Sequence, residues 1–345
     1  MRRRLTLGQA RPAPWSGTAD RALRVPRRHA IDFIRHSIDE KHRSIFMRCL
    51  VTGGTGLVGS NLTLALQAQG HEVTITGHES EQVMPAFKGK CLYPGILGID
   101  WEAIGKIDVL FHQAAINGTR VKDQREIMRA NLDASKALFE YAIGKGCKKI
   151  VYASSAAVYG DKPAPHRESD PTDPQTPYAW SKKRLDDYAM ALAAEHPEVT
   201  IVGLRYCNIF GPGENHKGTR ATMIYQFAQQ MLKGNPKLFK HGEQKRDYIY
   251  VKDVVRANVL AAGAAESCVV NCGSGSATSF NQIVDRLNAI LGLDRRPEYI
   301  DNPFEGVYQN HTECDMRLAR EKIGFVPDYS FEAGLLDYYR SGCLV

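Results

Sequence analysis

Apolar residues after position 46 occur in short runs that alternate with stretches of helical periodicity. The runs in RCLVTGG, HEVTIT, DVLFHQAA and KKIVYASS lack polar alternation and predict strands covered on both faces. After the first run, Val58, Leu62, Ala65 and Leu66 recur at helical spacing, and Gly70 can end that helix. The segment IMRANLDASKALFEYAIGKG predicts one long helix. Strands that alternate with helices predict an α/β protein with a doubly wound parallel sheet.

The second half of the chain is less regular. GPGENHKGTR predicts a polar, glycine-rich loop, and VVNCGSGSATSF predicts one more strand followed by a turn. We expect residues 47–205 and about 249–280 to form the domain that holds the parallel sheet. Residues from about 206–248 and 281–345 are expected to build a smaller mixed α/β lobe beside it.

Charge separates the first 46 residues from the rest. They hold 11 Lys and Arg against 4 Asp and Glu, which accounts for the whole formal charge of +7. The remainder is balanced, so we expect no nucleic-acid partner. The first segment carries Pro12, Pro14 and Pro26 and lacks the apolar region of a secretory signal. We expect a disordered basic leader or an extension upstream of a start at Met47, with a transit peptide as the alternative.

Composition places the remaining chain among soluble globular proteins, with 43% hydrophobic and 24% charged residues. No apolar stretch approaches the roughly 20 residues that a membrane helix needs, so no membrane partner is expected. The eight cysteines show no CxxC pair, and Cys268 and Cys272 fall in an apolar run. We therefore expect reduced thiols in the core, no metal site, and a reducing compartment, the cytoplasm.

Three glycines mark the turn between the first predicted strand and the first predicted helix. Gly53, Gly56 and Gly59 form a G-x-x-G-x-x-G pattern. Dinucleotide sites use such glycines because the turn is tight and a backbone must approach the pyrophosphate, while the helix start offers free N–H groups. The pattern favours a dinucleotide site, with a glycine turn that serves only packing as the alternative.

The end of the second predicted strand bears on the choice of dinucleotide. A carboxylate about twenty residues beyond the glycine turn would bind the ribose hydroxyls of NAD. Gly77 takes that place here, between Thr76 and His78. A 2′-phosphate would not be repelled by it, although no arginine is adjacent. We expect NADP as the cofactor, with NAD as the alternative.

Tyr178 and Lys182 lie four residues apart in PYAWSKKRLDDYA, a segment of helical periodicity. Their side chains are expected one above the other on one helix face. A phenol with a pKa of about 10 is a poor base, and a neighbouring ammonium and nicotinamide cation would lower that value. Ser154 and Ser155 end the strand KKIVYASS, where a hydroxyl can hydrogen-bond a reacting oxygen.

These motifs, with HQAA, Asn131 and RDYIYVKDV, resemble the extended short-chain dehydrogenase/reductases that modify nucleotide-sugars, over essentially all of residues 47–345. The resemblance implies a Rossmann domain with a substrate-binding lobe, a nucleotide-sugar substrate and a homo-oligomer. It implies that Tyr178 is the acid/base, that Lys182 holds the nicotinamide ribose, and that Ser155 orients the substrate hydroxyl. Asn131 would support the lysine. By matched position, the cofactor contacts would be Gly53, Gly56, Leu57, Gly59, His78, Gln113, Ala114, Ala115, Asn131 and Lys182.

The positions after the serine bear on the reaction. Dehydratases of this family carry an Asp-Glu pair there, because removal of water needs an extra acid and base. Ala156 and Ala157 occupy these positions, so the sequence does not favour a dehydratase. Decarboxylating relatives usually carry a glutamate there as well.

The segments RYCNIFGPGENHKGTRATM, PKLFKHGEQKRDYIYVKDV and GVYQNHTECDM are similar to the heptose 6-epimerase branch of the family. In that branch a loop lysine works opposite the tyrosine as a second acid/base, which implies this role for Lys217. A solvated loop lysine is the alternative. The resemblance assigns substrate contacts to Asn117, Asn208, Lys217, Thr219, Phe239, Arg246 and Tyr308. GHESEQ replaces the usual Asp-Asn after the second strand, and residues 80–100 match nothing specific.

We therefore expect an epimerase that oxidises and re-reduces a sugar carbinol with a tightly bound NAD(P). A nucleotide-sugar 4-epimerase or a ketosugar reductase of the same family is the alternative. A non-catalytic NADP-binding regulator on the same fold is a third hypothesis, which the intact Ser155, Tyr178 and Lys182 disfavour.

Overall fold

The computed structural model describes residues 46–345 apart from 79–82, 94, 117–122 and 303–309, and at 216, 219 and 220 it describes the backbone alone. Within the described residues, seven parallel strands form the main sheet in the order β10-β6-β5-β4-β1-β2-β3. These strands are β1 (Arg48–Thr52), β2 (Glu72–Thr76), β3 (Lys90–Leu92), β4 (Val109–His112), β5 (Lys149–Ser155), β6 (Thr200–Tyr206) and β10 (Cys268–Cys272).

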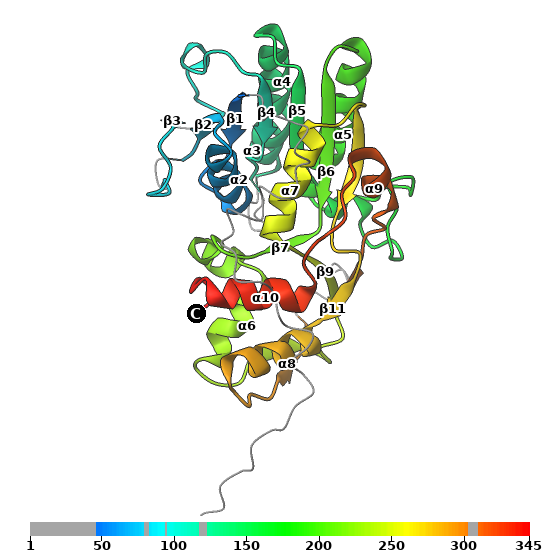
Figure 1. Ribbon diagram of the computed structural model, residues 1–345. Helices are drawn as coiled ribbons and strands as arrows, with labels where there is room; N and C mark the ends of the chain where they lie inside the picture. Colours follow the sequence, from blue (N-terminus) through cyan, green and yellow to red (C-terminus); the bar gives the residue numbers. More distant parts are fainter. Residues whose placement is uncertain (1–45, 79–82, 94, 117–122, 303–309) are drawn as a thin grey trace, which may run out of the picture. The chain divides into compact units, whose positions relative to one another are not determined.

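Helices cover both faces of this sheet (Figure 1). Successive strand residues point to opposite faces. Leu110 and Ile150 join a buried cluster with α4 and α5, whereas Phe111 and Val151 point to the other face, where α2 and α7 pack against each other. These helices are α2 (Leu57–Ala68), α3 (Gln124–Met128), α4 (Ala134–Gly144), α5 (Pro177–Glu195) and α7 (Val251–Ala262). The predicted doubly wound Rossmann sheet is confirmed.

The long helix predicted after the third strand is interrupted. The structure has α3, then a π-helical turn at Arg129–Asp133, then α4. Asn131 lies within that turn, and its side chain bonds Ile116 and Ser181 rather than its own helix. The extra residue in the turn follows from these tertiary contacts, which helical periodicity does not contain.

The second lobe is built around a small sheet. In it β9 (Lys245–Tyr250) pairs with β7 (Asn208–Phe210), β11 (Ala277–Ser279) and β13 (His311–Thr312), and nearby β8 (Lys237–Phe239) pairs with β12 (Glu298–Ile300). The helices of this lobe are α6 (Met223–Met231), α8 (Phe280–Leu291) and α10 (Phe331–Arg340). Phe210, Phe227 and Tyr338 are fully buried in their shared core. Helix α9 (Arg317–Ile323) packs on β10 and α7.

Two local predictions need correction. GPGENHKGTR is not wholly loop, because Asn215–Arg220 forms 3₁₀ turns. VVNCGSGSATSF contains two strands rather than one, since β11 follows β10 and pairs antiparallel with β9. The strand β11 arises from pairing with the distant β9, whereas the 3₁₀ turns are closed by local backbone hydrogen bonds, such as that from Lys217 N to the Glu214 carbonyl.

The cysteines of the described residues are free thiols, and Cys49, Cys147, Cys207, Cys272 and Cys314 are buried. In the same part of the chain, none of the helices combines the length and apolarity needed to cross a membrane.

Candidate active site

A cavity of about 900 Å³ opens at the carboxyl ends of β1 and β4, between the sheet domain and the second lobe. Chain connections leave these two neighbouring strands in opposite directions along the sheet, the place where open α/β sheets bind ligands. The predicted positions that line it are Gly53, Gly56, Leu57, Gly59, His78, Gln113, Ala114, Ala115, Asn131, Ser155, Tyr178, Lys182, Asn208, Lys217 and Arg246. Phe239 does not line it. Asn117 and Tyr308, and the side chain of Thr219, lie outside the described residues.

The three glycines of the turn serve different purposes. Gly53 has a φ of +65°, and a Cβ there would lie 2.9 Å from the Ala114 backbone. A Cβ on Gly59 would lie 2.0 Å from the Gly53 carbonyl oxygen. At Gly56 the nearest atom would be 3.3 Å away, and this residue faces the cavity. Protein contacts therefore require Gly53 and Gly59, whereas Gly56 keeps space open for a ligand.

Gly56 is also the N-cap of α2 and has no side chain to occupy the helix start. The first N–H groups of a helix lack partners within the helix and attract anions. The first turn of α2 contains no acidic residue. The open space at Gly56 and the free helix start together fit the pyrophosphate of a dinucleotide.

The far end of the cavity is formed after β2. Gly77 and His78 line it together with Ile96 and Leu97. A Cβ on Gly77 would lie 2.7 Å from the Thr55 side chain, so a larger residue would require a local shift. Carboxylates do not occur among the described residues that line this end.

Tyr178 lies at the start of α5, and its hydroxyl is hydrogen-bonded to the side chain of Ser155 at the end of β5. Thr176 caps the helix and Pro177 begins it, so the tyrosine projects from a fixed first turn. Burial raises the pKa of Tyr178, and the hydrogen bond from Ser155 opposes that shift. The phenol is therefore protonated in the cofactor-free protein.

Lys182 lies one turn further along α5 and is 1% exposed. Its Nζ donates to the Ala153 carbonyl oxygen at 2.7 Å and lies 5.8 Å from the centre of the Tyr178 ring. Burial lowers the pKa of Lys182 to about 8, and the charge of Asp186 opposes this. The ammonium is thus a buried charge with hydrogen-bonding capacity left for a ligand in the cavity.

Asn131 connects two segments of the site. Its side-chain carbonyl accepts from Ile116 N at 2.8 Å, while its amide donates to the Ile116 carbonyl at 2.9 Å and to Ser181 Oγ at 3.1 Å. Ser181 precedes Lys182 and bonds back to the Tyr178 carbonyl. These contacts agree with a supporting role for Asn131.

A second buried network extends below the glycine turn. His112 at the end of β4 contacts Thr52 Oγ at 2.7 Å and Ser135 Oγ at 2.8 Å. Burial, and then the charge of Lys182, lower the pKa of His112 to about 3, so its ring is neutral. Thr52 also accepts from Ala114 N, which fixes the strand end next to the cavity.

Gln113, the next residue, is held by a closed set of side-chain hydrogen bonds. It accepts from the Tyr206 hydroxyl at 2.9 Å and donates to Asn258 at 2.9 Å. Asn258 in turn donates to the Tyr206 hydroxyl at 2.8 Å. Sequence reasoning did not single out Tyr206 or Asn258, because their roles depend on contacts between β6 and α7.

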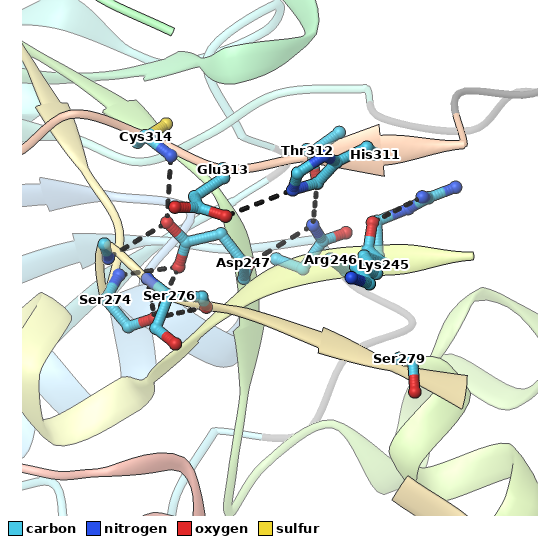
Figure 2. A network of polar contacts seen from close by, with 12 residues as sticks. Lys245, Arg246, Asp247, Ser274, Ser276, Ser279, His311, Thr312, Glu313 and Cys314 are labelled. Carbon is cyan, nitrogen blue, oxygen red and sulfur yellow. Dashed lines mark hydrogen bonds and ion pairs between the residues drawn. The ribbon is translucent and has the colours of Figure 1, made fainter. Parts of the chain in front are cut away.

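Arg246 enters the cavity from β9 in the second lobe, where its guanidinium lies over the Phe280 ring. The neighbouring Asp247 accepts hydrogen bonds from the backbone N–H and hydroxyl of Ser274 and from the backbone of Gly275 and Cys314 (Figure 2). These bonds tie β9 to the β10–β11 turn and to the segment after β13. They also occupy all the carboxylate lone pairs, so Asp247 has none left for a metal ion, although Cys207 and Cys314 lie close by.

Lys217 lines the cavity from the loop between β7 and α6. Among the described charged residues of the lining, Lys182, Lys217 and Arg246 outnumber the single carboxylate, Glu126. The cavity is therefore suited to an anionic ligand such as a diphosphate.

Sequence reasoning missed two residues that hold this loop. Glu214 is 0% exposed and accepts hydrogen bonds from the residues at both loop ends. Asn61 on α2 donates to the Pro212 carbonyl oxygen at 2.9 Å. A buried carboxylate inside a polar segment leaves no periodic signal, and a polar residue on a helix is ordinarily a solvated one.

Residues 49–273 match the NAD dependent epimerase/dehydratase family. ADP-L-glycero-D-manno-heptose-6-epimerase from Helicobacter pylori is 34% identical over 86% of this chain and 96% of its own, with a TM-score of 0.78. UDP-N-acetylglucosamine 4-epimerase from Methanobrevibacter ruminantium M1 is 31% identical over 86% and 97%, with a TM-score of 0.79. UDP-glucose 4-epimerase from Thermotoga maritima is 30% identical over 86% and 99%, with a TM-score of 0.78.

The family match covers the glycine turn, Ser155, Tyr178 and Lys182, and the similar structures extend into the second lobe. The resemblance derived from the motifs is thereby confirmed. The chain belongs to the NAD dependent epimerase/dehydratase family and is an NAD(P)-dependent nucleotide-sugar epimerase.

Proposed function

We propose that this protein is an ADP-glyceromanno-heptose 6-epimerase that inverts the exocyclic C6 carbinol of its sugar. The observation that carries the proposal is that Lys217 and Tyr178 line one cavity from different parts of the fold. Tyr178 comes from α5 beside the sheet, whereas Lys217 comes from the second-lobe loop. Two proton-carrying groups that reach one substrate from different elements suit inversion at a carbon.

The proposed role of each residue follows from its contacts. A nicotinamide held beside Lys182 would supply the hydride chemistry, oxidising the carbinol carbon and re-reducing it from the opposite face. Tyr178 holds the proton of the sugar hydroxyl on one face, and Ser155, its hydrogen-bond partner, orients that hydroxyl. The buried ammonium of Lys182 favours the ionised phenol and can hydrogen-bond the nicotinamide ribose. On the other face of the ketone, Lys217 donates the proton to the reacting oxygen, or accepts it in the reverse direction.

The substrate's diphosphate suits the second-lobe end of the cavity. Arg246 is 9% exposed and lies on a strand fixed by Asp247, so its guanidinium is preorganised. A planar guanidinium can form two parallel hydrogen bonds with a phosphate. Asn208 lines the same region from β7 and is held by the Asp247 carbonyl.

We propose NADP as the preferred cofactor, with NAD as the alternative. Gly77 stands where an acidic residue would bind the ribose hydroxyls and repel a 2′-phosphate. We also propose a homo-oligomer in the cytoplasm, and the two-lobe division given above. Light scattering on purified protein tests the oligomeric state.

The test of the proposed function is incubation with a panel of nucleotide-sugars, with product stereochemistry read by NMR. Conversion of an ADP-linked heptose at C6, and no conversion of UDP-hexoses at C4, is the expected result. Lys217→Met should abolish that epimerisation while dinucleotide content stays at the wild-type level. A Lys217→Met variant with unchanged epimerisation would exclude the two-base mechanism.

A nucleotide-sugar 4-epimerase is the second candidate, because two of the similar structures are 4-epimerases at almost the same identity. A 4-epimerase can use the tyrosine alone when the sugar ring turns over in the site. Inversion of UDP-hexoses that persists in Lys217→Met would favour this candidate.

A further inference from the structure

Glu214 is a fully buried carboxylate that is hydrogen-bonded to Thr222, a residue of the cavity lining. Its Oε2 accepts from Thr222 N at 2.7 Å, and its Oε1 accepts from Gly211 N at 3.3 Å and from Thr222 Oγ at 3.2 Å. Burial raises the pKa of Glu214, and the hydrogen bonds of Thr222 and Gly211 oppose the shift. Burial of a charged group is costly unless it is paired and hydrogen-bonded, so these contacts make the position tolerable.

The contacts of Glu214 join the two ends of the loop that contains Lys217. Gly211 follows β7 directly, and Thr222 is the N-cap of α6. The backbone N–H of Lys217 donates to the Glu214 carbonyl oxygen at 2.9 Å, so the lysine backbone is also tied to Glu214. The Glu214 side chain thus fixes both ends of the loop, and the Glu214 backbone fixes its middle.

Two titratable groups act on the Glu214 carboxylate. The charge of Lys217 lowers the pKa of Glu214, which places the ammonium within electrostatic reach. Tyr338 on α10 lies beside the carboxylate, and burial and the Glu214 charge raise the pKa of that phenol. Lys217 therefore contributes positive charge near this buried carboxylate.

We propose that Glu214 is a positioning residue for Lys217: it closes the loop and directs the ammonium into the cavity. This inference rests on the proposed function, in which Lys217 moves a proton. Glu214 itself does not line the cavity, so it acts only through the loop. A shift of about 1 Å in a reacting group can cost about 100-fold in rate.

Action through Lys217 alone has a specific kinetic signature. Loss of Glu214 should lower kcat and leave the KM for substrate nearly unchanged, because Arg246 and Asn208 still bind the nucleotide-sugar. Once Lys217 is absent, further removal of Glu214 should cost nothing, because residues that act as a unit are not additive.

The experiment compares Glu214→Gln, Lys217→Met and the double variant with wild type, using ADP-D-glycero-D-manno-heptose as the probe. Glutamine keeps the size and one acceptor but removes the charge and leaves one N–H of the loop unpaired. Asp253→Asn is the matched control. Asp253 lies on α7, away from Lys217, and is also buried. Its carboxylate accepts hydrogen bonds from the backbone N–H groups of Asp328 and Tyr329. Thermal unfolding and dinucleotide content are measured for each variant.

We expect Glu214→Gln to fold, to retain its dinucleotide and to lose about 100-fold in kcat with KM within about threefold of wild type. The double variant should equal Lys217→Met, and Asp253→Asn should turn over like wild type. Wild-type kcat in Glu214→Gln, or a loss of kcat that comes with a KM raised more than about threefold, would overturn the inference. If Glu214→Gln does not fold, Glu214→Asp, which keeps the charge but is too short to join both ends, replaces it with the same expectations.

Failure of the proposed function gives a different result. In that case wild type leaves the heptose unchanged, or Lys217→Met retains full epimerisation. Failure of the inference alone leaves wild type active, Lys217→Met inactive and Glu214→Gln fully active.

Discussion

The Nζ of Lys182 donates to the Ala153 carbonyl oxygen at 2.7 Å and lies 5.8 Å from the centre of the Tyr178 ring, so that a buried ammonium stands beside this phenol. Burial keeps the pKa of Lys182 at about 8, below the ordinary value of 10.5. Because this pKa is lower in the native protein than in the unfolded chain, the unfolded chain binds the Lys182 proton more firmly. The buried charge therefore destabilises the native state below about pH 8, and this cost disappears as the pH rises to about 10.

The first prediction is that Lys182→Met stabilises the cofactor-free protein at neutral pH and abolishes turnover. The gain in the free energy of unfolding should shrink as the pH rises from about 7 to 10, by at most about 1.4 kcal/mol per pH unit. Urea unfolding of both proteins measures it. Buried thiols such as Cys49 act in the opposite sense, because burial raises their pKa, so the difference between the two proteins is the quantity to compare. A difference that is constant with pH would contradict a buried ammonium.

Tyr178→Phe should cut turnover by at least about 100-fold, the scale for loss of a general acid or base. Binding of the dinucleotide and substrate should change little, because only the hydroxyl is removed. The control is Tyr188→Phe on the same helix, whose hydroxyl donates to Glu140 away from the cavity. Steady-state kinetics measure the effect. Near wild-type kcat in Tyr178→Phe, equal to that of Tyr188→Phe, would contradict the assignment of Tyr178 as the acid/base.

Gly56→Val should fold and lose its dinucleotide. A Cβ at this position meets no atom closer than 3.3 Å, so the added side chain enters the cavity instead of the protein. Gly59→Ala should behave in the opposite way and lose about 1–3 kcal/mol of stability, because its Cβ would overlap the Gly53 carbonyl. Dinucleotide content and thermal unfolding separate the two effects. Normal dinucleotide content in Gly56→Val would show that the turn does not approach the ligand.

Gly77→Asp should shift cofactor preference from NADP toward NAD. A carboxylate there can bind ribose hydroxyls and repels a 2′-phosphate, so the ratio of the two Kd values should change by at least about 10-fold. Because the new Cβ would lie 2.7 Å from the Thr55 side chain, the substitution is combined with Thr55→Ala, and Thr55→Ala alone is the control. An unchanged ratio, measured by calorimetry, would remove Gly77 as the basis for the preference.

Sequence patterns predict the early part of the fold well because its strands are apolar and its first helix is periodic. The strand β6 is harder to see, since Arg205 puts a charge near its end. That guanidinium is buried against Asp186 of α5 at 3.0 Å, so the charge is compensated only in the folded chain. Periodicity carries no information on such a partner.

The candidate site divides in the same way. Tyr178, Lys182, Ser155 and the glycine turn follow from local spacing, and the structure brings them together around one cavity. The residues that hold these side chains in place cannot be predicted from spacing. The π-helical turn at Asn131 accompanies a contact with the distant Ser181, and Glu214 is held within its own loop by hydrogen bonds from Gly211 and Thr222. Isolated polar residues of this kind are indistinguishable from solvated ones until the segments meet.

The hydrogen bond from Asn61 to Pro212 links α2, whose start is proposed to bind the pyrophosphate, with the loop that carries Lys217. Thermodynamic linkage is reciprocal, so any free energy by which a dinucleotide orders this loop is returned when a sugar orders the same loop. The dinucleotide is then bound most tightly while a sugar is bound. An enzyme that must give back the hydride it has just removed needs this, since escape of the reduced dinucleotide would leave the oxidised sugar without its reductant.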